Sequence, residues 1–224
     1  MLDAMGTLPD RVAAVRDIRR RLAADGPGAV RGDGDFERVA IPSADGDVLR
    51  DLLVAEGARV VIEVGLAYGA SALAIAEALV GQDDDDAEHV IIDAFQDHFH
   101  GAGWDALGRA GVADDVCTLL AERSQLALAR LAADGFRADA AFVDGSHRFH
   151  NVFVDLFYLW ELVRPGGLIV MDDCEWPSVA TAVRYFERNA GWRSEPIDSA
   201  TRLRAYRLPD ERVEAPFEDF VPFG

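Results

Sequence analysis

The sequence predicts an α/β protein: a doubly wound, mostly parallel, Rossmann-like sheet of about seven strands that ends in a C-terminal antiparallel strand pair. From residue 60 onward, short apolar runs alternate with helical segments, which is the pattern of βαβ units. The first run, Val60–Val64, passes through a glycine turn at Gly65 and Gly69 into a helix. The 224 residues, half of them hydrophobic, can fill one sizeable core rather than two.

The N-terminal part is predicted to be helical over Pro9–Ala24, because apolar side chains recur there at helical spacing. A glycine-rich loop follows over Gly26–Gly34, and Val48–Glu56 predicts a second helix that leads into the first strand. We expect residues 1–40 to form an N-terminal helix and loop, acting as a cap or a dimer contact. Residues 41–224 are expected to form the main domain.

The remaining elements follow from alternating apolar runs and helical periodicity, and such alternation places helices on both faces of a parallel sheet. The expected strands are Val60–Val64, His89–Asp93, Val116–Ala121, Ala140–Val143 and Leu168–Met171. The expected helices are Ser71–Val80, Gly103–Gly111, Ser124–Asp134, Phe149–Val163 and Ser178–Ala190. Two extended runs, Arg193–Ile197 and Arg202–Leu208, complete the sheet as an antiparallel pair.

Composition narrows the possible partners. The chain carries 22 basic and 40 acidic residues, and a net charge of -18 opposes binding to nucleic acid or to anionic membranes. Cys117 and Cys174 are too few for a disulfide framework, and no apolar run reaches membrane-spanning length. The N-terminus has no signal-peptide pattern. We therefore expect a soluble cytoplasmic protein that does not act on nucleic acid.

The glycine turn indicates the kind of cofactor. A dinucleotide fingerprint would require glycine in place of Ala67, and a phosphate loop would require Gly-Lys-Ser/Thr, which is absent here. Glu63, two residues before Gly65, would repel a pyrophosphate but suits a ligand that carries an ammonium group and a sulfonium. The pattern favours S-adenosylmethionine over NAD or ATP. Alternatively, the glycines serve only to pack the strand against the helix.

Polar residues at the ends of the second and third strands fit the rest of such a cofactor. Asp93 ends the second strand, where an acid can accept hydrogen bonds from both ribose hydroxyls. Ser124 and Gln125 follow the third strand and can meet an adenine edge. The alternatives are a surface turn at Asp93 and a helix cap at Ser124.

Acidic residues follow the fourth and fifth strands. Asp144 ends one of them, while Asp172 and Asp173 end the other. Three uncompensated carboxylates at one sheet edge would repel one another. A divalent cation bound through oxygen would relieve this repulsion, and Mg²⁺ is the cation that we expect. The alternative is that these residues cap a helix and form a turn.

Taken together, these motifs resemble those of class I S-adenosylmethionine-dependent methyltransferases. Within them they are similar to the metal-dependent small-molecule O-methyltransferases typified by catechol O-methyltransferase, and to antibiotic and sugar tailoring enzymes. The resemblance extends from about Ile41 to the final strand pair. The matching positions are Glu63, Gly65, Gly69 and Ser71 in the glycine turn, Asp93, the Ser124 and Gln125 pair, and Pro165-Gly166-Gly167.

The resemblance implies roles for the acidic residues. The family's metal ligands correspond to Asp144, which also borders the cofactor, to Asp172, and to a position that is often asparagine but is Asp173 here. The family's lysine base corresponds to His147, and a histidine, with an unperturbed pKa of about 6.5, can remove a proton near neutrality. The alternative for His147 is a local hydrogen bond at a helix start. A zinc site built from His98, His100, His147 and His150 matches no standard spacing.

The function implied is transfer of a methyl group to a hydroxyl of a catechol or vicinal diol, assisted by the cation and by His147. Substrate contacts are expected from the loops Asp97–Trp104 and Glu175–Ser178, with Trp104 and Trp176 as aromatic walls. One alternative is a metal-independent methyltransferase, and another is a non-catalytic protein that binds S-adenosylmethionine. The N-terminal helix and the tail Phe217–Phe223 are candidate dimer contacts.

Overall fold

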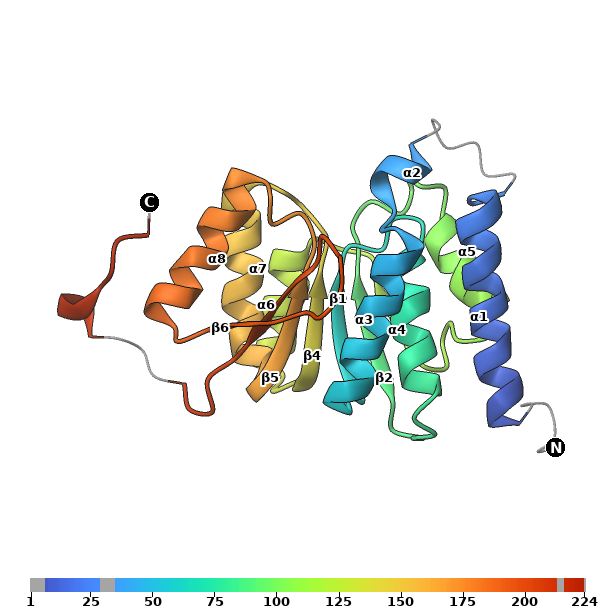
Figure 1. Ribbon diagram of the computed structural model, residues 1–224, viewed down its shortest axis with the longest axis horizontal. Helices are drawn as coiled ribbons and strands as arrows, with labels where there is room; N and C mark the ends of the chain where they lie inside the picture. The colour runs from blue at the N-terminus through green and yellow to red at the C-terminus, as the bar shows by residue number, and fades with distance from the viewer. Residues whose placement is uncertain (1–6, 29–34, 213–215, 224) are drawn as a thin grey trace.

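A seven-stranded sheet forms the centre of the protein, as expected (Figure 1). The computed structural model describes residues 7–28, 35–212 and 216–223. The strands are β1 (Val60–Val64), β2 (Glu88–Ile92), β3 (Cys117–Leu120), β4 (Ala138–Val143), β5 (Val163–Met171), β6 (Arg193–Glu195) and β7 (Arg204–Arg207). Their order is β3-β2-β1-β4-β5-β7-β6. The first five run parallel, and β7 lies antiparallel to both β5 and β6, which confirms the predicted doubly wound sheet with an antiparallel pair.

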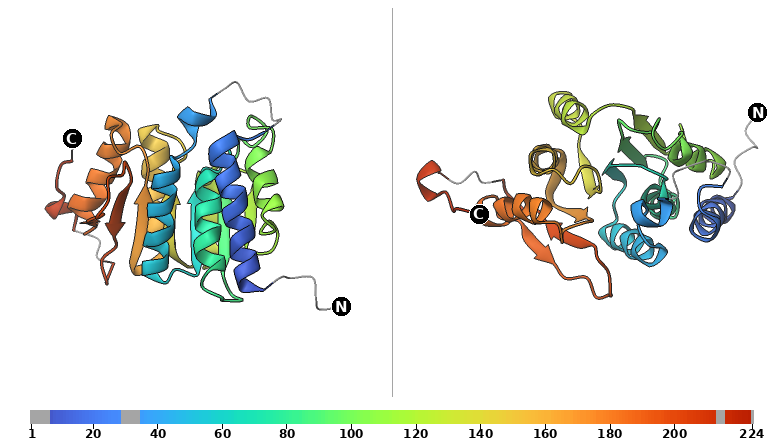
Figure 2. Two further views of the ribbon diagram at one scale, coloured as in Figure 1. Left: turned by 45° about the vertical axis from the view of Figure 1, so that its right-hand side comes forward. Right: turned by 90° about the horizontal axis from the view of Figure 1, so that it is seen from above.

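Helices cover both faces of the sheet (Figure 2). One face carries α3 (Ser43–Glu56), α4 (Ala70–Val80) and α5 (Ala102–Arg109), with α1 (Leu8–Asp25) packed on α4. The other face carries α6 (Ser124–Ala133), α7 (Phe149–Leu162) and α8 (Pro177–Asn189). The chain also forms two short helices, α2 (Phe36–Val39) and the 3₁₀ turn η1 (Phe217–Asp219).

The central strands are buried on both faces, which explains why they read as continuous apolar runs. In β1, Val61 packs in the cluster under α3 and α4, whereas Ile62 packs in the cluster under α7. Both side chains are fully buried. Successive residues of this strand therefore face two different buried cores, whereas in a half-exposed strand every second residue would face solvent.

The largest differences from expectation are two element boundaries and one additional helix. Helix α3 begins at Ser43 rather than at Val48, because Pro42 precedes a first turn whose polar residues resemble a loop. Strand β5 begins at Val163 and includes Pro165-Gly166-Gly167, since Gly167 accepts a hydrogen bond from Leu208 at its edge. Helix α2, four residues long, was not predicted.

Residues 29–34 of the expected loop Gly26–Gly34 lie outside the described residues. Within the ranges described, no helix has the length and apolar character needed to cross a bilayer.

A close backbone approach at Gly65 fixes the carboxyl ends of β1 and β4. Gly65 has φ of 99°, and a Cβ there would lie 2.1 Å from the carbonyl oxygen of Asp144. The amide of Asp144 donates to Val64 at 2.9 Å, and the amide of Gly65 donates to Ile92 at 3.0 Å. A side chain at position 65 would therefore force apart the three strand ends that meet there.

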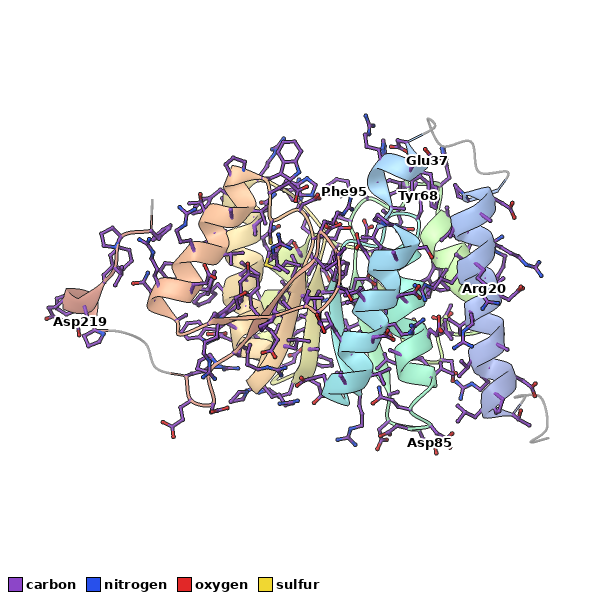
Figure 3. The ribbon with its side chains drawn as sticks, in the orientation of Figure 1. Arg20, Glu37, Tyr68, Asp85, Phe95 and Asp219 are labelled. Atoms are coloured by element: carbon purple, nitrogen blue, oxygen red, sulfur yellow. The ribbon has the colours of Figure 1, made fainter. Side chains whose placement is uncertain are left out.

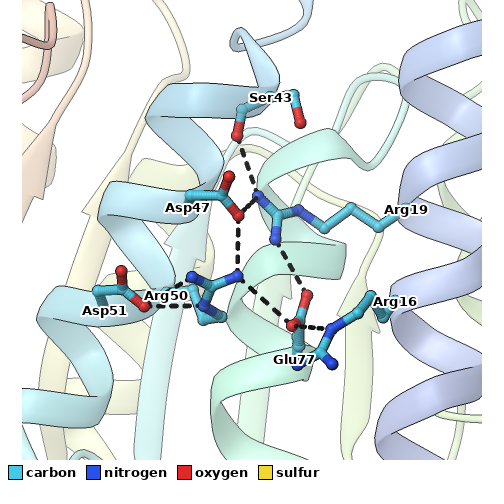
Figure 4. A network of polar contacts seen from close by, with 7 residues as sticks. All are labelled: Arg16, Arg19, Ser43, Asp47, Arg50, Asp51 and Glu77. Atoms are coloured by element: carbon cyan, nitrogen blue, oxygen red, sulfur yellow. Dashed lines mark hydrogen bonds and ion pairs between the residues drawn. The ribbon is translucent and has the colours of Figure 1, made fainter.

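A buried carboxylate joins the helices on one face of the sheet (Figure 4). Glu77 of α4 is bonded by Arg16 and Arg19 of α1, at 2.9 and 3.0 Å, and contacts Arg50 of α3 at 3.5 Å. Asp47 links Arg19 and Arg50 from the other side. Burial alone would raise the pKa of Glu77, but the hydrogen bonds from Arg16 and Arg19 outweigh burial and lower it. This network attaches α1 to the domain.

We expect Gly65→Ala to destabilise the protein by more than about 4 kcal/mol, because the new methyl group would overlap the carbonyl of Asp144. Denaturant unfolding measures the change. As a control, Gly108→Ala in α5 adds a methyl group that meets no atom within 4 Å and should stabilise the protein by about 0.5 kcal/mol. Equal stability of Gly65→Ala and wild type would contradict the close approach.

We expect Glu77→Gln to lower the free energy of unfolding at neutral pH by about 3 kcal/mol, because Arg16 and Arg19 would lose the buried carboxylate that they share. The pKa of Glu77 is depressed in the folded protein, so its contribution is present above the unfolded pKa of about 4.3 and is lost as the pH falls through the folded value. The free energies of unfolding of wild type and Glu77→Gln, measured at several pH values, should therefore become equal in acid. Asp17→Asn, which removes an exposed pair with Arg21, should cost less than about 1 kcal/mol throughout.

Candidate functional site

A cleft of about 910 Å³ lies at the carboxyl ends of the parallel strands, where ligands bind in doubly wound sheets. Figure 3 shows the labelled residues Tyr68 and Phe95 at this end of the sheet, beside α2, with Asp85 at the opposite end. The cleft is lined by residues from almost every strand end, including Ile41, Gly65, Ser71, Asp93, Ser124, Asp144, Asp173, Trp176 and Arg202. Most of the predicted site residues therefore meet in one place.

The glycine turn is held in shape by Asp93. One carboxylate oxygen, Oδ2, accepts hydrogen bonds from the amides of Leu66 and Ala67, both at 3.0 Å, and from Gln96 Nε2 at 3.0 Å. The other oxygen accepts from the amide of Phe95 at 2.6 Å. These four donors equal the roughly four acceptor positions of a carboxylate. A ribose hydroxyl would have to share one of them, and the predicted ribose contact of Asp93 stays a prediction.

Glu63 lies beneath the cleft rather than in its lining. Its side chain is fully buried, and one oxygen accepts a hydrogen bond from the hydroxyl of Ser71, which does line the cleft. The other oxygen lies 3.0 Å from Nε2 of His89 on β2. Nδ1 of the same histidine lies 3.6 Å from Sγ of Cys117 on β3, and burial raises the pKa of that thiol. Direct contact of Glu63 with the cofactor stays a prediction, and the structure gives Glu63 a supporting role for Ser71.

Gly69 completes the turn at the start of α4. Its φ of 84° is left-handed, and a Cβ there would lie 3.0 Å from the carbonyl oxygen of Gly103. Glycine therefore permits α4 and α5 to begin close together, which is consistent with the packing alternative as well as with a cofactor turn.

Ser124 and Gln125 form the first turn of α6, and both line the cleft. Behind them lies Asp155 of α7, 1 % exposed, which Ser124 bonds through its hydroxyl and Gln125 approaches with Nε2 at 3.4 Å. Burial raises the pKa of Asp155 to about 7, with the hydrogen bond from Ser124 lowering it. The predicted adenine pair is thus supported by a third, buried residue.

Asp144, His147 and Asp173 converge at the other side of the cleft. Their potential ligand atoms lie within 4.8 Å of one another, the one such group of three among the residues that the structure describes. His147 Nε2 lies 2.6 Å from Asp173 Oδ2. Burial raises the pKa of Asp144 well above its usual range, and the charges of Asp172 and Asp173 raise it further. A bound cation would remove the cost of these neighbouring carboxylates.

Asp172 is engaged elsewhere. Its Oδ2 accepts hydrogen bonds from Nε of Arg202, at 2.9 Å, and from Nη2, while Oδ1 accepts from the amide of Asp173 at 2.8 Å. The carboxylate is 2 % exposed and absent from the cleft lining. The structure therefore groups two of the predicted carboxylates with His147 and pairs the third acid, Asp172, with Arg202. Metal ligation by Asp172 stays a prediction.

The aromatic and histidine residues divide into two groups. Trp176 is 53 % exposed in the cleft and stacks on His147, with ring centroids 6.3 Å apart and planes 11° apart. His150 also lines the cleft, as does Phe99 from the expected loop Asp97–Trp104. Trp104 instead packs against the core, and His98 and His100 are absent from the lining. The structure therefore does not bring the four histidines of the zinc alternative into one ligand group in its described part.

Sequence reasoning missed three residues of the site. Arg202 lies 30 positions from Asp172, and no local pattern joins them. His89 is the second residue of the apolar strand β2, and nothing near it in the sequence indicates its partner Glu63. For Asp155, a signal was present, because the spacing of Val152, Asp155, Leu156 and Leu159 places it on the apolar face of α7.

Comparisons with solved structures give close matches in fold. The O-methyltransferase TomG from Streptomyces achromogenes, involved in tomaymycin synthesis and solved with SAM, is 21% identical, with a TM-score of 0.62 over 94% of this chain and 93% of that one. Cofactor-bound Rv0187 from MTB is 20% identical, with a TM-score of 0.64 over 95% and 94%. An O-methyltransferase from Bacillus cereus, solved with SAH, is 17% identical, with a TM-score of 0.61 over 93% of each chain. These likenesses establish the Rossmann-like fold.

Sequence comparison establishes the family. A search of curated proteins gave no match. The sequence profile described as "Methyltransferase domain" matches residues 62–174, from β1 to the turn after β5. This segment is half of the chain and carries the glycine turn, Asp93, the Ser124 and Gln125 pair, and the acids at the ends of β4 and β5. The chain therefore belongs to the methyltransferase domain family.

Proposed function

We propose that this protein transfers a methyl group from S-adenosylmethionine to a hydroxyl of a small molecule, and that a divalent cation assists the reaction. The observation that carries the proposal is the layout of one cleft. Gly65, Ser71 and Ser124 lie among its lining residues, together with the Asp144, His147 and Asp173 group. Two structural neighbours hold SAM or SAH, which supports the choice of methyl donor.

The cofactor side of the cleft is formed by backbone and small polar groups. S-adenosylmethionine supplies a methyl group on a positively charged sulfur. Gly65 lets the carboxyl ends of β1 and β4 meet at the cleft, and the hydroxyl of Ser71 is hydrogen-bonded to Glu63. Phe95, with its side chain 65 % exposed in the cleft, offers an apolar face for a purine ring.

The donor set fits a divalent cation. Asp144, Asp173 and His147 would hold it, with two carboxylates and one imidazole as donors. Oxygen donors suit Mg²⁺, and an imidazole among them also suits Mn²⁺. Such an ion supplies Lewis acidity, which lowers the pKa of a bound hydroxyl. Two adjacent oxygens of a catechol or vicinal diol are the acceptor that such a site favours.

His147 is proposed to take the proton of the acceptor. Asp173 bonds Nε2 of the imidazole at 2.6 Å, which fixes the ring and leaves Nδ1 as the second nitrogen. This use of His147 competes with its use as a metal donor. Trp176, stacked on the imidazole and half exposed, offers a flat wall for a planar acceptor.

A metal-independent methyltransferase is a second candidate, and one observation favours it. Arg202 places a permanent positive charge next to Asp172, so this carboxylate is neutralised without a metal ion. In this case the paired His147 and Asp173 would act as base without a metal. The net charge of -18 favours small-molecule acceptors over nucleic acid in both cases, and we propose a cytoplasmic location.

Calorimetric titration of the chelator-treated protein, first with S-adenosylmethionine and then with Mg²⁺ or Mn²⁺, tests donor and metal together. We expect the donor to bind to wild type, Asp144→Asn and Asp173→Asn. Metal affinity should fall by at least tenfold in both variants, because each loses an anionic ligand.

Asp97→Asn provides the matched control, because Asp97 is exposed near the cleft but does not line it. Its metal affinity should equal that of wild type. Absence of donor binding would contradict the proposed cofactor. Donor binding with no metal signal in wild type would select the metal-independent candidate.

We expect His147→Ala to lower kcat by about 10²-fold or more, since a positioned base typically contributes that much, with little change in donor affinity. Initial rates with the catechol or diol that the wild type accepts measure the change. His98→Ala, which removes an exposed ring outside the cleft lining, is the control and should keep the wild-type rate. A wild-type rate in His147→Ala would assign proton removal to another group.

A further inference from the structure

A buried carboxylate lies directly behind the two residues proposed to face the cofactor's base. Asp155 is 1 % exposed and sits in α7 among Val152, Leu156 and Leu159 of the apolar core. It belongs neither to the cleft lining nor to the Asp144, His147 and Asp173 group. A carboxyl buried among apolar residues is costly unless hydrogen bonds compensate for it, so its partners define its role.

Those partners are Ser124 and Gln125. The side chain of Ser124 is hydrogen-bonded to the Asp155 carboxyl. Because an ionised carboxylate only accepts hydrogen bonds, the Ser124 hydroxyl is the donor to it. Gln125 directs Nε2 toward Oδ1 of Asp155 at 3.4 Å. Burial raises the pKa of Asp155 to about 7, so the carboxylate form predominates above neutrality. The same carboxyl thus receives a donor from each residue of the pair.

This arrangement fixes which atoms face the cleft. An ionised carboxylate accepts hydrogen bonds and donates none, so a flipped Gln125 amide would place two acceptors against each other. With Nε2 held inward, Oε1 of Gln125 is the atom left for a ligand. With its hydrogen directed to Asp155, the hydroxyl of Ser124 likewise offers its oxygen lone pairs. Both residues then present acceptors.

We propose that Asp155 is a positioning residue that sets the base preference of the cofactor site: it turns the donors of Ser124 and Gln125 inward so that their acceptors select an amino group at position 6 of a purine. The inference rests on the proposed use of S-adenosylmethionine. Adenine carries an amino donor at position 6, whereas hypoxanthine carries an acceptor there. A base that offers an acceptor to two fixed acceptors is rejected, because it leaves polar groups unpaired.

The test is the ratio of affinities for S-adenosylhomocysteine and S-inosylhomocysteine, measured by calorimetry at about pH 8.5, where the carboxylate is ionised. We expect wild type to prefer the adenine compound by about tenfold or more. In Asp155→Asn, the new amide can both donate and accept, so either orientation of Gln125 is satisfied and the preference should fall toward unity. Asp134→Asn, exposed at the end of α6, is the matched control and should keep the wild-type ratio.

The ratio separates positioning from stability, because loss of packing would weaken both ligands equally. An unchanged ratio in Asp155→Asn, with both ligands bound, would overturn the inference and leave the proposed function intact. Equal affinity of wild type for both ligands would also overturn it, without any variant having to fold. Failure of wild type to bind S-adenosylhomocysteine would instead overturn the proposed cofactor, and the inference with it.

Discussion

The contact between the backbone of Gly65 and that of Asp144 is the constraint on which the site depends. No side chain fits between them, because a Cβ at position 65 would lie 2.1 Å from the carbonyl oxygen of Asp144. The approach brings the ends of β1 and β4 together, so that the cofactor turn and the first acid of the candidate metal group line the same cleft. Asp93 then pins the turn from β2 through the amides of Leu66 and Ala67.

Charge balance is the second theme of the cleft. Three aspartates end β4 and β5, and the structure compensates them in different ways. Asp172 forms an ion pair with Arg202, Asp173 accepts a hydrogen bond from the imidazole of His147, and Asp144 is left with a pKa raised by burial and by its acidic neighbours. Because the first two acids have partners within the chain, Asp144 is the group that gains most from an added cation. The cation in the proposed mechanism therefore has a local electrostatic reason that is independent of any family resemblance.

A layer of buried polar groups supports the residues that face the cleft. Glu63 orients Ser71 from one face of the sheet, and Asp155 holds Ser124 and Gln125 from the other. Each is a carboxylate that accepts hydrogen bonds from a residue of the cleft lining. An anionic acceptor behind a polar side chain holds the donor group of that side chain toward the protein interior. Such preorganisation reduces the entropy lost when a ligand binds.

The sequence by itself determined the order of strands and helices, the glycine turn, and the set of polar residues at the strand ends. Helical and strand periodicity are local properties, and the carboxyl ends of parallel strands necessarily share one edge of the sheet. It could not determine which of these side chains enter the cleft. Glu63 lies below the lining, next to Ser71 and His89, and Asp172 pairs with Arg202, while the predicted cofactor contact of Glu63 and metal ligation by Asp172 stay predictions. Those partners come from α4, from β2 and from the segment just before β7, so only the tertiary structure decided which charge each carboxylate meets. The reason is that electrostatic partners are set by distance in space rather than along the chain.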